Sequence, residues 1–190
     1  MHTKEVTTWK DRWVGETVFV LASGPSLTHA DVELVQGRKT IVTNTTYKIA
    51  PWANVLFFHD TRWFEHYKSD LDSFKGEIVT ISPTKHPRVT RLSKPLLNAY
   101  GNSGAGAISL AILAGAAKVI LLGVDAQYDK KVHWHGDHPS GLGNARSVNK
   151  WPAQFEKVAQ HAKDNNCIVL NASRNTKLKC FEKVQLEDVL

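Results

Sequence analysis

The feature that most constrains this fold is a series of short apolar runs that alternate with stretches of helical periodicity. The runs are rich in β-branched and aromatic residues, and none alternates cleanly between polar and apolar residues, as expected of strands covered on both faces. They occupy residues 17–22, 40–43, 54–58, 77–81, 118–122 and 167–170. Helical spacing is found over residues 29–36, 61–71, 104–114 and 151–165. This alternation predicts an α/β fold, a Rossmann-like domain with a mostly parallel sheet and helices on both faces.

The length of 190 residues fits a single domain that spans the whole chain. No apolar run approaches the ~20 residues of a membrane-spanning helix, and residues 1–15 lack the apolar segment of a secretory signal. The two cysteines, Cys167 and Cys180, form no CxxC pair, so we expect neither a disulfide framework nor a thiolate zinc site. These observations predict a cytoplasmic protein that does not associate with membranes, and they leave open whether it forms a homo-oligomer.

The charge distribution favours an anionic partner. Lysine and arginine outnumber aspartate and glutamate by 24 to 18, and no acidic residue occurs between Ile78 and Val124. Both a solvated basic face and a field for a phosphate or a nucleic acid backbone explain this pattern. Nucleic acid binding therefore stays open, but it is not the favoured hypothesis.

Small and polar residues follow each predicted strand. Right-handed crossovers place every strand-to-helix loop on one edge of a parallel sheet, where ligands bind in folds of this class. A further polar segment, Asn102-Ser103-Gly104, opens a helix of small residues. The sequence therefore predicts a ligand site built from these loops, which are Ser23-Gly24-Pro25-Ser26, Asn44-Thr45-Thr46, His59-Asp60-Thr61, Gly123-Val124-Asp125 and Asn171-Ala172-Ser173.

Several common motifs are missing or incomplete. The loop at Gly24 carries one glycine rather than the three of GxGxxG, no GxxxxGK[ST] occurs, and a plain turn with a helix cap also explains this loop. Residues 104–109 read GxGxxS, but no strand precedes them, which argues against NAD; small residues there also allow a helix to pack tightly on a sheet. Covalent catalysis has no good candidate because GxSxG is absent.

Three histidines gather in the segment His133-Trp134-His135-Gly136-Asp137-His138. It matches the HxHxDH pattern of dinuclear zinc hydrolases of the metallo-β-lactamase type, but too little chain follows to supply their later ligands. Three interpretations remain: a lone zinc site, exposed histidines, or a general base, for which an imidazole pKa of about 6.5 is suited. The segment lies in the long connection 123–150, which is predicted to cover the site.

Taken together, these segments resemble a known family. The series consists of residues 18–27, Asn44, Asn102-Ser103-Gly104 with the helix that follows, and residues 120–125. Its order and spacing resemble the bacterial sialyltransferases with a single Rossmann-like domain, and the related motility-associated-factor and pterin pyrophosphokinase-like proteins. The chain looks closer still to small phage-encoded proteins in which residues 133–138 and 141–145 recur. The resemblance covers residues 17–173 and implies a phage-encoded, glycosyltransferase-like enzyme with a nucleotide-activated sugar as donor.

The resemblance also implies roles for the residues that match the family's motifs. His135 or His138 would act as general base, with His133 the weaker match, and the acceptor stays unknown. Asn102, Ser103 and Gly104 would meet a phosphate or the sugar carboxylate at a helix N-terminus. The remaining donor contacts would come from Gly24, Pro25, Ser26, Asn44, Asp125 and Tyr128.

Two departures from the sialyltransferase pattern keep other functions open. Ala22-Ser23 stands where those enzymes usually carry Gly-Asn, so the resemblance does not fix the donor. Asp60 is an added carboxylate, and Asp60 and Asp125 would together suit Mg²⁺. The alternatives are an ATP- and Mg²⁺-dependent pyrophosphokinase-like transferase and a non-catalytic phage accessory or assembly protein.

Overall fold

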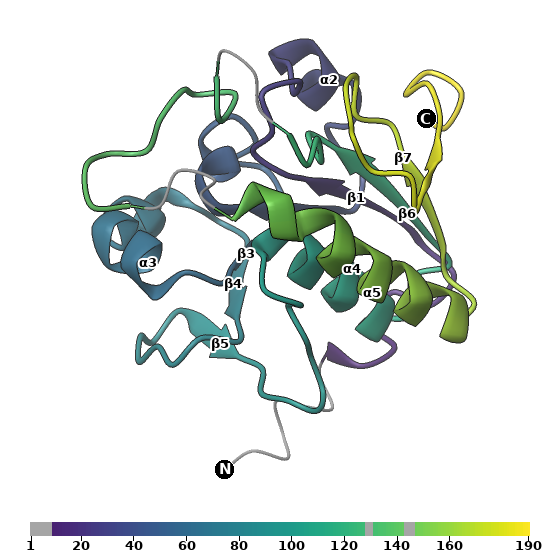
Figure 1. Cartoon of the computed structure of the whole chain (residues 1–190). Coiled ribbons are helices and arrows are strands. Elements are labelled where there is room, and N and C mark those ends of the chain that lie inside the picture. Colours follow the sequence, from purple (N-terminus) through teal and green to yellow (C-terminus); the bar gives the residue numbers. More distant parts are fainter. Residues whose placement is uncertain (1–8, 128–130, 143–146) are drawn as a thin grey trace.

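A computed structural model describes residues 9–127, 131–142 and 147–190 (Figure 1). Strands and helices alternate as the sequence predicts. The strands are β1 (Thr17–Leu21), β2 (Thr40–Thr43), β3 (Val55–Phe58), β4 (Glu77–Thr80), β5 (Val89–Arg91), β6 (Lys118–Leu122), β7 (Ile168–Asn171) and β8 (Glu182–Lys183). The helices are α2 (His29–Leu34), α3 (Thr61–Tyr67), α4 (Ser103–Leu113) and α5 (Trp151–Asp164), with 3₁₀ turns η1 (Asn44–Lys48), η2 (Asp70–Ser73) and η3 (Val148–Lys150).

The strands form one eight-stranded sheet in the order β5-β4-β3-β2-β1-β6-β7-β8. Every pairing between neighbours is parallel, which confirms the predicted α/β class. The strand order reverses between β1 and β6. In open sheets of this kind, ligands bind outside the carboxyl ends of the strands at the reversal. The topology therefore places the best ligand site beside the loops that follow β1 and β6.

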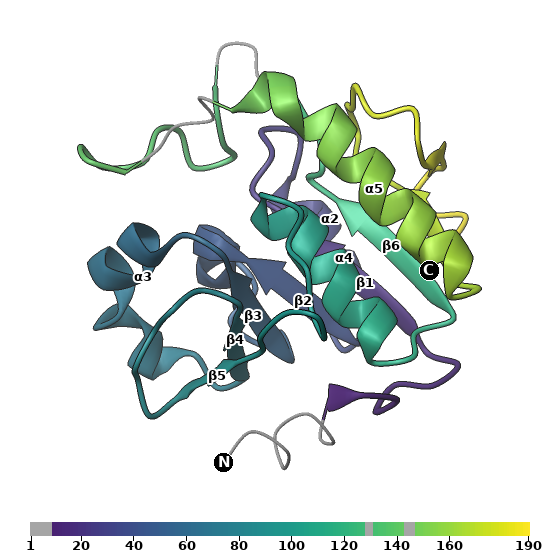
Figure 2. The ribbon, with the colours of Figure 1, turned by 60° about the horizontal axis from the view of Figure 1, so that its bottom comes forward.

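Two apolar cores cover the two faces of the sheet, and side chains along each strand alternate between them. Val18 and Val20 of β1 belong to the core under α4 and α5, whereas Phe19 and Leu21 belong to the core under α2 and α3. Figure 2 shows α4 and α5 side by side on one face. Helices on both faces are therefore confirmed, and burial of both faces explains the uninterrupted apolar runs. No helix among the described residues is long and apolar enough to cross a membrane.

The small residues of α4 allow this helix to lie close against the sheet. α4 contacts β1, β2 and β3, and its residues from Ala105 to Ile112 are buried. A Cβ atom added to Gly106 would lie 2.3 Å from the ring of Phe57, which is itself fully buried in β3. The helix can therefore approach β3 only because position 106 has no side chain.

We predict that Gly106→Ala destabilises the protein although alanine is the better helix former. The gain in helix propensity is about 1 kcal/mol, but displacing a ring in a packed core costs about 1–3 kcal/mol, so we expect a net loss of up to about 2 kcal/mol. Urea unfolding measures this change. Gly104→Ala is the matched control, because its Cβ would lie no closer than 3.2 Å to Phe155. Equal stabilities for the two variants would contradict this account of the packing.

Candidate functional site

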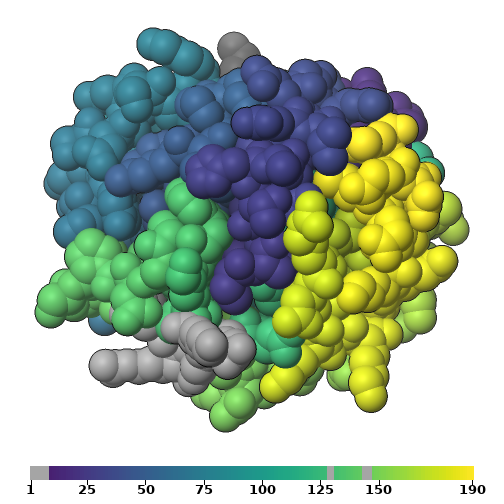
Figure 3. Space-filling model, turned by 90° about the horizontal axis from the view of Figure 1, so that it is seen from above, coloured from purple at the N-terminus to yellow at the C-terminus, as the bar shows by residue number. Residues whose placement is uncertain are grey.

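A cavity of about 880 Å³ lies at the carboxyl ends of β1, β2, β3 and β6. Its wall consists of the residues that follow these strands, the start of α4, described residues between β6 and α5, and the start of α5. In Figure 3 the green segment that contains residues 131–142 lies beside the blue and purple segments of the first third of the chain. The volume is within the ~300–1,000 Å³ range of small-molecule sites. The cavity is at the edge where the sequence predicts the ligand site.

The loops that follow β1 and β6 meet at Gly24. The backbone N–H of Gly24 donates to the carbonyl oxygen of Gly123 over 2.8 Å. A Cβ atom on Gly24 would lie 2.3 Å from that oxygen, so no other residue fits at this contact. Gly24 lines the cavity, and the close approach that it permits is between two segments of the chain itself; its predicted contact with a nucleotide stays a prediction.

Ser26 and Asp125 lock the same two loops together. The N–H and O–H groups of Ser26 donate to the two carboxylate oxygens of Asp125 over 2.8 and 2.6 Å. Asp125 is 2% exposed; burial raises its pKa to about 6, although the bonds from Ser26 act to lower it. Asp125 lines the cavity, whereas Pro25 and Ser26 do not. Ser26 and Asp125 were predicted to contact a sugar-nucleotide donor. In the structure they bond to each other, and this bond stabilises the shape of the cavity.

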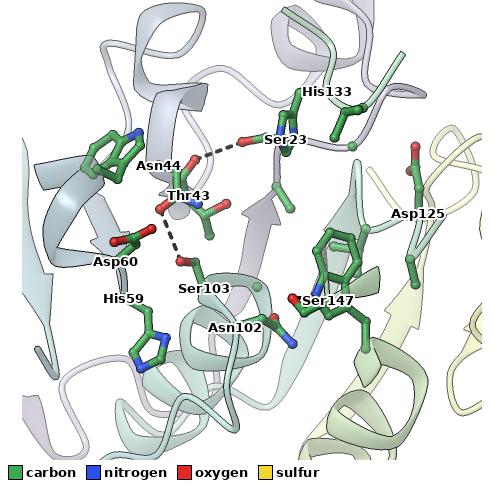
Figure 4. Close-up of a pocket in the computed structure, with 18 of the residues that line it drawn as sticks. Ser23, Thr43, Asn44, His59, Asp60, Asn102, Ser103, Asp125, His133 and Ser147 are labelled. Carbon is green, nitrogen blue, oxygen red and sulfur yellow. Dashed lines mark hydrogen bonds between the residues drawn. The ribbon is translucent and has the colours of Figure 1, made fainter. Parts of the chain in front are cut away.

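The start of α4 faces the cavity beside Asn44. The Ser103 hydroxyl donates to the side-chain oxygen of Asn44 over 3.1 Å, and Asn44 has a left-handed φ of 48°, which asparagine tolerates better than most residues (Figure 4). Ser103 and Gly104 line the cavity, and the first N–H groups of a helix have no partner within the helix. Asn102 also lines it; its side chain caps α4 through Ala105 and bonds to Gln154 of α5. The sequence-based prediction that a phosphate or carboxylate meets this helix N-terminus therefore stays a prediction, and the helix dipole there would favour such an anion.

Asp60 and Asp125 lie on opposite sides of the cavity in Figure 4. The Asp60 carboxylate accepts a hydrogen bond from the N–H of Arg62 over 2.8 Å and caps α3, while the Asp125 carboxylate is engaged by Ser26. The geometry therefore gives no support to a Mg²⁺ ion shared by these two side chains. His59, which directly precedes Asp60, also lines the cavity. Burial lowers the pKa of His59, and the charge of Asp60 acts in the opposite direction.

The histidine segment is anchored over the cavity by Trp134. Its backbone N–H donates to the Ser23 carbonyl oxygen over 3.1 Å, and its indole N–H lies 3.4 Å from the hydroxyl of Thr46. His133 and His138 line the cavity, whereas His135 stacks on His133 with a centroid distance of 5.1 Å. The part of the connection 123–150 that the structure describes thus contributes directly to the wall. Tyr128, a predicted donor contact, lies outside the described residues.

Burial disfavours the charged form of all three imidazoles. Burial lowers the pKa of His133 to about 3 and that of His135 to about 4, and it also lowers the pKa of His138. A general base works best with a pKa near the working pH, so such rings are weaker bases than free imidazole. The same burial favours the neutral form of the imidazole, which is the form that binds a metal ion.

Sequence reasoning missed the wall formed by Ser147, Lys150, Trp151 and Phe155. Ser147 and Lys150 lie beside and in η3, and Trp151 and Phe155 lie in the first turns of α5, which was predicted only as a helix. The sequence did contain a signal for this part of the wall. The connection 123–150 leaves the sheet at the edge where ligands are expected, and α5 begins where that connection ends. The indole N–H of Trp151 donates to the Ser147 hydroxyl over 3.1 Å, which fixes an aromatic ring at the mouth of the cavity.

No protein-family model matches this chain, and no curated protein matches it. Among solved structures, the fold is similar to the MAf glycosyltransferase from Magnetospirillum magneticum AMB-1, with a TM-score of 0.64 over 98% of this chain and 12% sequence identity. The chain covers 38% of that enzyme. This likeness shows that the chain has the fold found in a glycosyltransferase. The phage origin and the likeness to pyrophosphokinases stay predictions.

We predict that Asp125 makes stability fall as the pH rises. Its folded pKa of about 6 lies above its ordinary value of 3.8, so between these values the folded state holds a proton that the unfolded state has lost. The contribution of this group to the free energy of unfolding then declines by up to about 1.4 kcal/mol per pH unit.

Urea unfolding from about pH 4 to pH 7 tests this linkage in the wild type and in Asp125→Asn. The variant keeps the size of the side chain and one acceptor for Ser26, but it does not titrate. We expect a less negative slope of stability against pH in the variant. Parallel curves for the two proteins would show that Asp125 does not have a raised pKa.

Proposed function

We propose that this chain is a glycosyltransferase-like enzyme that binds a nucleotide-activated sugar in the cavity. The observation that carries the proposal is the position of the α4 N-terminus, which opens into a cavity at the reversal of strand order. This arrangement offers backbone N–H groups and a helix dipole to a phosphate where open α/β sheets bind nucleotides. The likeness of the fold to a glycosyltransferase supports the same class of ligand.

In the proposed complex, the donor phosphate lies against Ser103 and Gly104, and Asn44 orients the Ser103 hydroxyl. The nucleoside or the sugar then lies along the start of α5, where Trp151 offers an aromatic face and Lys150 a positive charge. Fixed N–H groups at the phosphate stabilise the charge that develops on the departing nucleotide. Such preorganised dipoles are commonly the largest contribution to catalysis in a site of this kind.

The identity of the general base stays a prediction. His138 lines the cavity and is better placed than His135, which does not. The nearby carboxylates of Asp60 and Asp137 raise the pKa of His138, but burial has the larger effect and leaves that pKa below its ordinary value. Proton acceptance by either ring is therefore weaker than the sequence pattern alone suggests.

We predict that Ser103→Asp weakens nucleotide binding at least about tenfold without unfolding the chain. An aspartate in the first turn of a helix is stabilising by about 0.3–1 kcal/mol. Like charges about 4 Å apart at an effective dielectric constant of about 20 repel by about 4 kcal/mol, so we expect at least a tenfold loss of affinity for phosphate-bearing ligands. Titration calorimetry with CMP, UDP, GDP and their sugar conjugates measures the loss, with and without Mg²⁺.

Ser103→Asn is the matched control, because it has nearly the same shape as aspartate but no charge. The proposal requires that wild type and Ser103→Asn bind one of these nucleotides, and that Ser103→Asp binds it at least about tenfold more weakly. The absence of binding at millimolar concentration in the wild type would instead favour a non-catalytic accessory protein. Mg²⁺-dependent binding of ATP in preference to every nucleotide sugar would favour the pyrophosphokinase-like alternative.

A further inference from the structure

We propose that the imidazoles of His133, His135 and His138 form a metal site that binds one Zn²⁺ ion. One potential ligand nitrogen from each ring lies within 4.8 Å of the other two. Tetrahedral zinc with Zn–N bonds of about 2.0–2.1 Å holds its ligand nitrogens roughly 3.3 Å apart. Side-chain movements of about an ångström therefore suffice to close the three rings on an ion.

The backbone of this segment brings the three rings together. Gly136 has a φ of 87°, in the left-handed region that glycine adopts most readily, and its N–H donates to the His133 carbonyl oxygen over 3.0 Å. This turn returns the chain so that the centroid of the His138 ring lies 4.5 Å from that of His133. The bonds of Trp134 to Ser23 and Thr46 then hold the turn against the sheet edge. The cluster is thus built by local hydrogen bonds and not by chance contact of exposed side chains.

Two of the rings, those of His133 and His135, each have one buried nitrogen that is left over within the part of the chain that the structure describes. The Nε2 atoms of both rings are buried and have no hydrogen-bond partner within residues 9–127, 131–142 and 147–190. A metal–nitrogen bond would satisfy two atoms that are otherwise buried at a cost.

The ligand set favours zinc with one open position. Three imidazoles with no thiolate suit Zn²⁺ better than the hard ions Mg²⁺ and Ca²⁺. Zinc sites with three protein ligands keep a fourth position for water or substrate. Because His133 and His138 line the cavity, that position is expected to open toward whatever the cavity binds. A coordinated nitrogen cannot accept a proton, so zinc binding through His138 would replace its predicted role as general base.

This inference does not rest on the proposed function. If the chain binds zinc but no nucleotide, the metal site is supported and the glycosyltransferase proposal is wrong. Nucleotide binding by a chain that takes up no zinc would do the reverse.

The test uses the full chain without a histidine tag, first freed of metal with a chelator. After dialysis against Zn²⁺, elemental analysis is expected to give one zinc per chain. His133→Ala and His135→Ala should each lower the zinc affinity by about 100-fold or more, since loss of even an outer partner of a metal ligand costs about 10–100-fold. His161→Ala, which removes a histidine from α5 outside the cluster, is the control and should keep one zinc.

The site is excluded if the wild type takes up no zinc, or if both cluster variants bind it as tightly as the wild type. Thermal unfolding of each variant in metal-free buffer shows whether a loss of zinc reflects a loss of fold. A variant that melts far below the wild type is set aside, and the cobalt measurement on the unaltered chain then decides.

Co²⁺ reports the geometry of the site because its visible absorption is strong in four-coordinate sites and weak in six-coordinate ones. We expect a strong band from the wild type that one equivalent of Zn²⁺ removes. Azide should shift the band if a coordination position is open. A weak six-coordinate spectrum would overturn the tri-histidine site, and a band that azide leaves unchanged would overturn its open position.

Discussion

The contact between the loops that follow β1 and β6 determines the shape of the cavity. Gly24 allows a backbone-to-backbone hydrogen bond to Gly123, and Ser26 encloses the buried carboxylate of Asp125. The sheet reverses its strand order between β1 and β6. These hydrogen bonds hold the two loops together at the reversal. The structure uses a glycine, a serine and an aspartate to fix the base of the cavity before any ligand arrives.

Other elements of the site are positioned relative to this contact between the two loops. Ser23, one residue before Gly24, accepts the hydrogen bond that holds Trp134 and with it the histidine segment. On the face of the sheet that α4 covers, Gly106 allows α4 to approach β3. This approach brings the Ser103 hydroxyl within hydrogen-bonding distance of Asn44. The cavity therefore has one corner formed by a helix N-terminus and another formed by imidazole side chains.

The sequence predicted the sheet well because each central strand is covered on both faces and therefore reads as an apolar run. β5 and β8 were missed, since edge strands of three and two residues carry no such signal. The strand-end rule selected Gly24 and Asp125, and the polar segment that opens a helix selected Ser103; all three line the cavity. The strand-end rule could not show that Asp125 bonds to Ser26, because that pairing joins positions 99 residues apart. The closeness of the three histidine rings depends on local turn geometry, which the pattern HxHxDH does not determine.

The central claim is that a phosphate-bearing ligand binds at the N-terminus of α4. Backbone amide signals followed by nuclear magnetic resonance, as a nucleoside diphosphate or nucleotide sugar is added, test it residue by residue. The account predicts that the Ser103 and Gly104 amides shift most, with Asn44 and Gly24 following, while amides on the outer side of α2 stay in place. Shifts confined to residues outside the cavity, or none at saturating ligand, would contradict it.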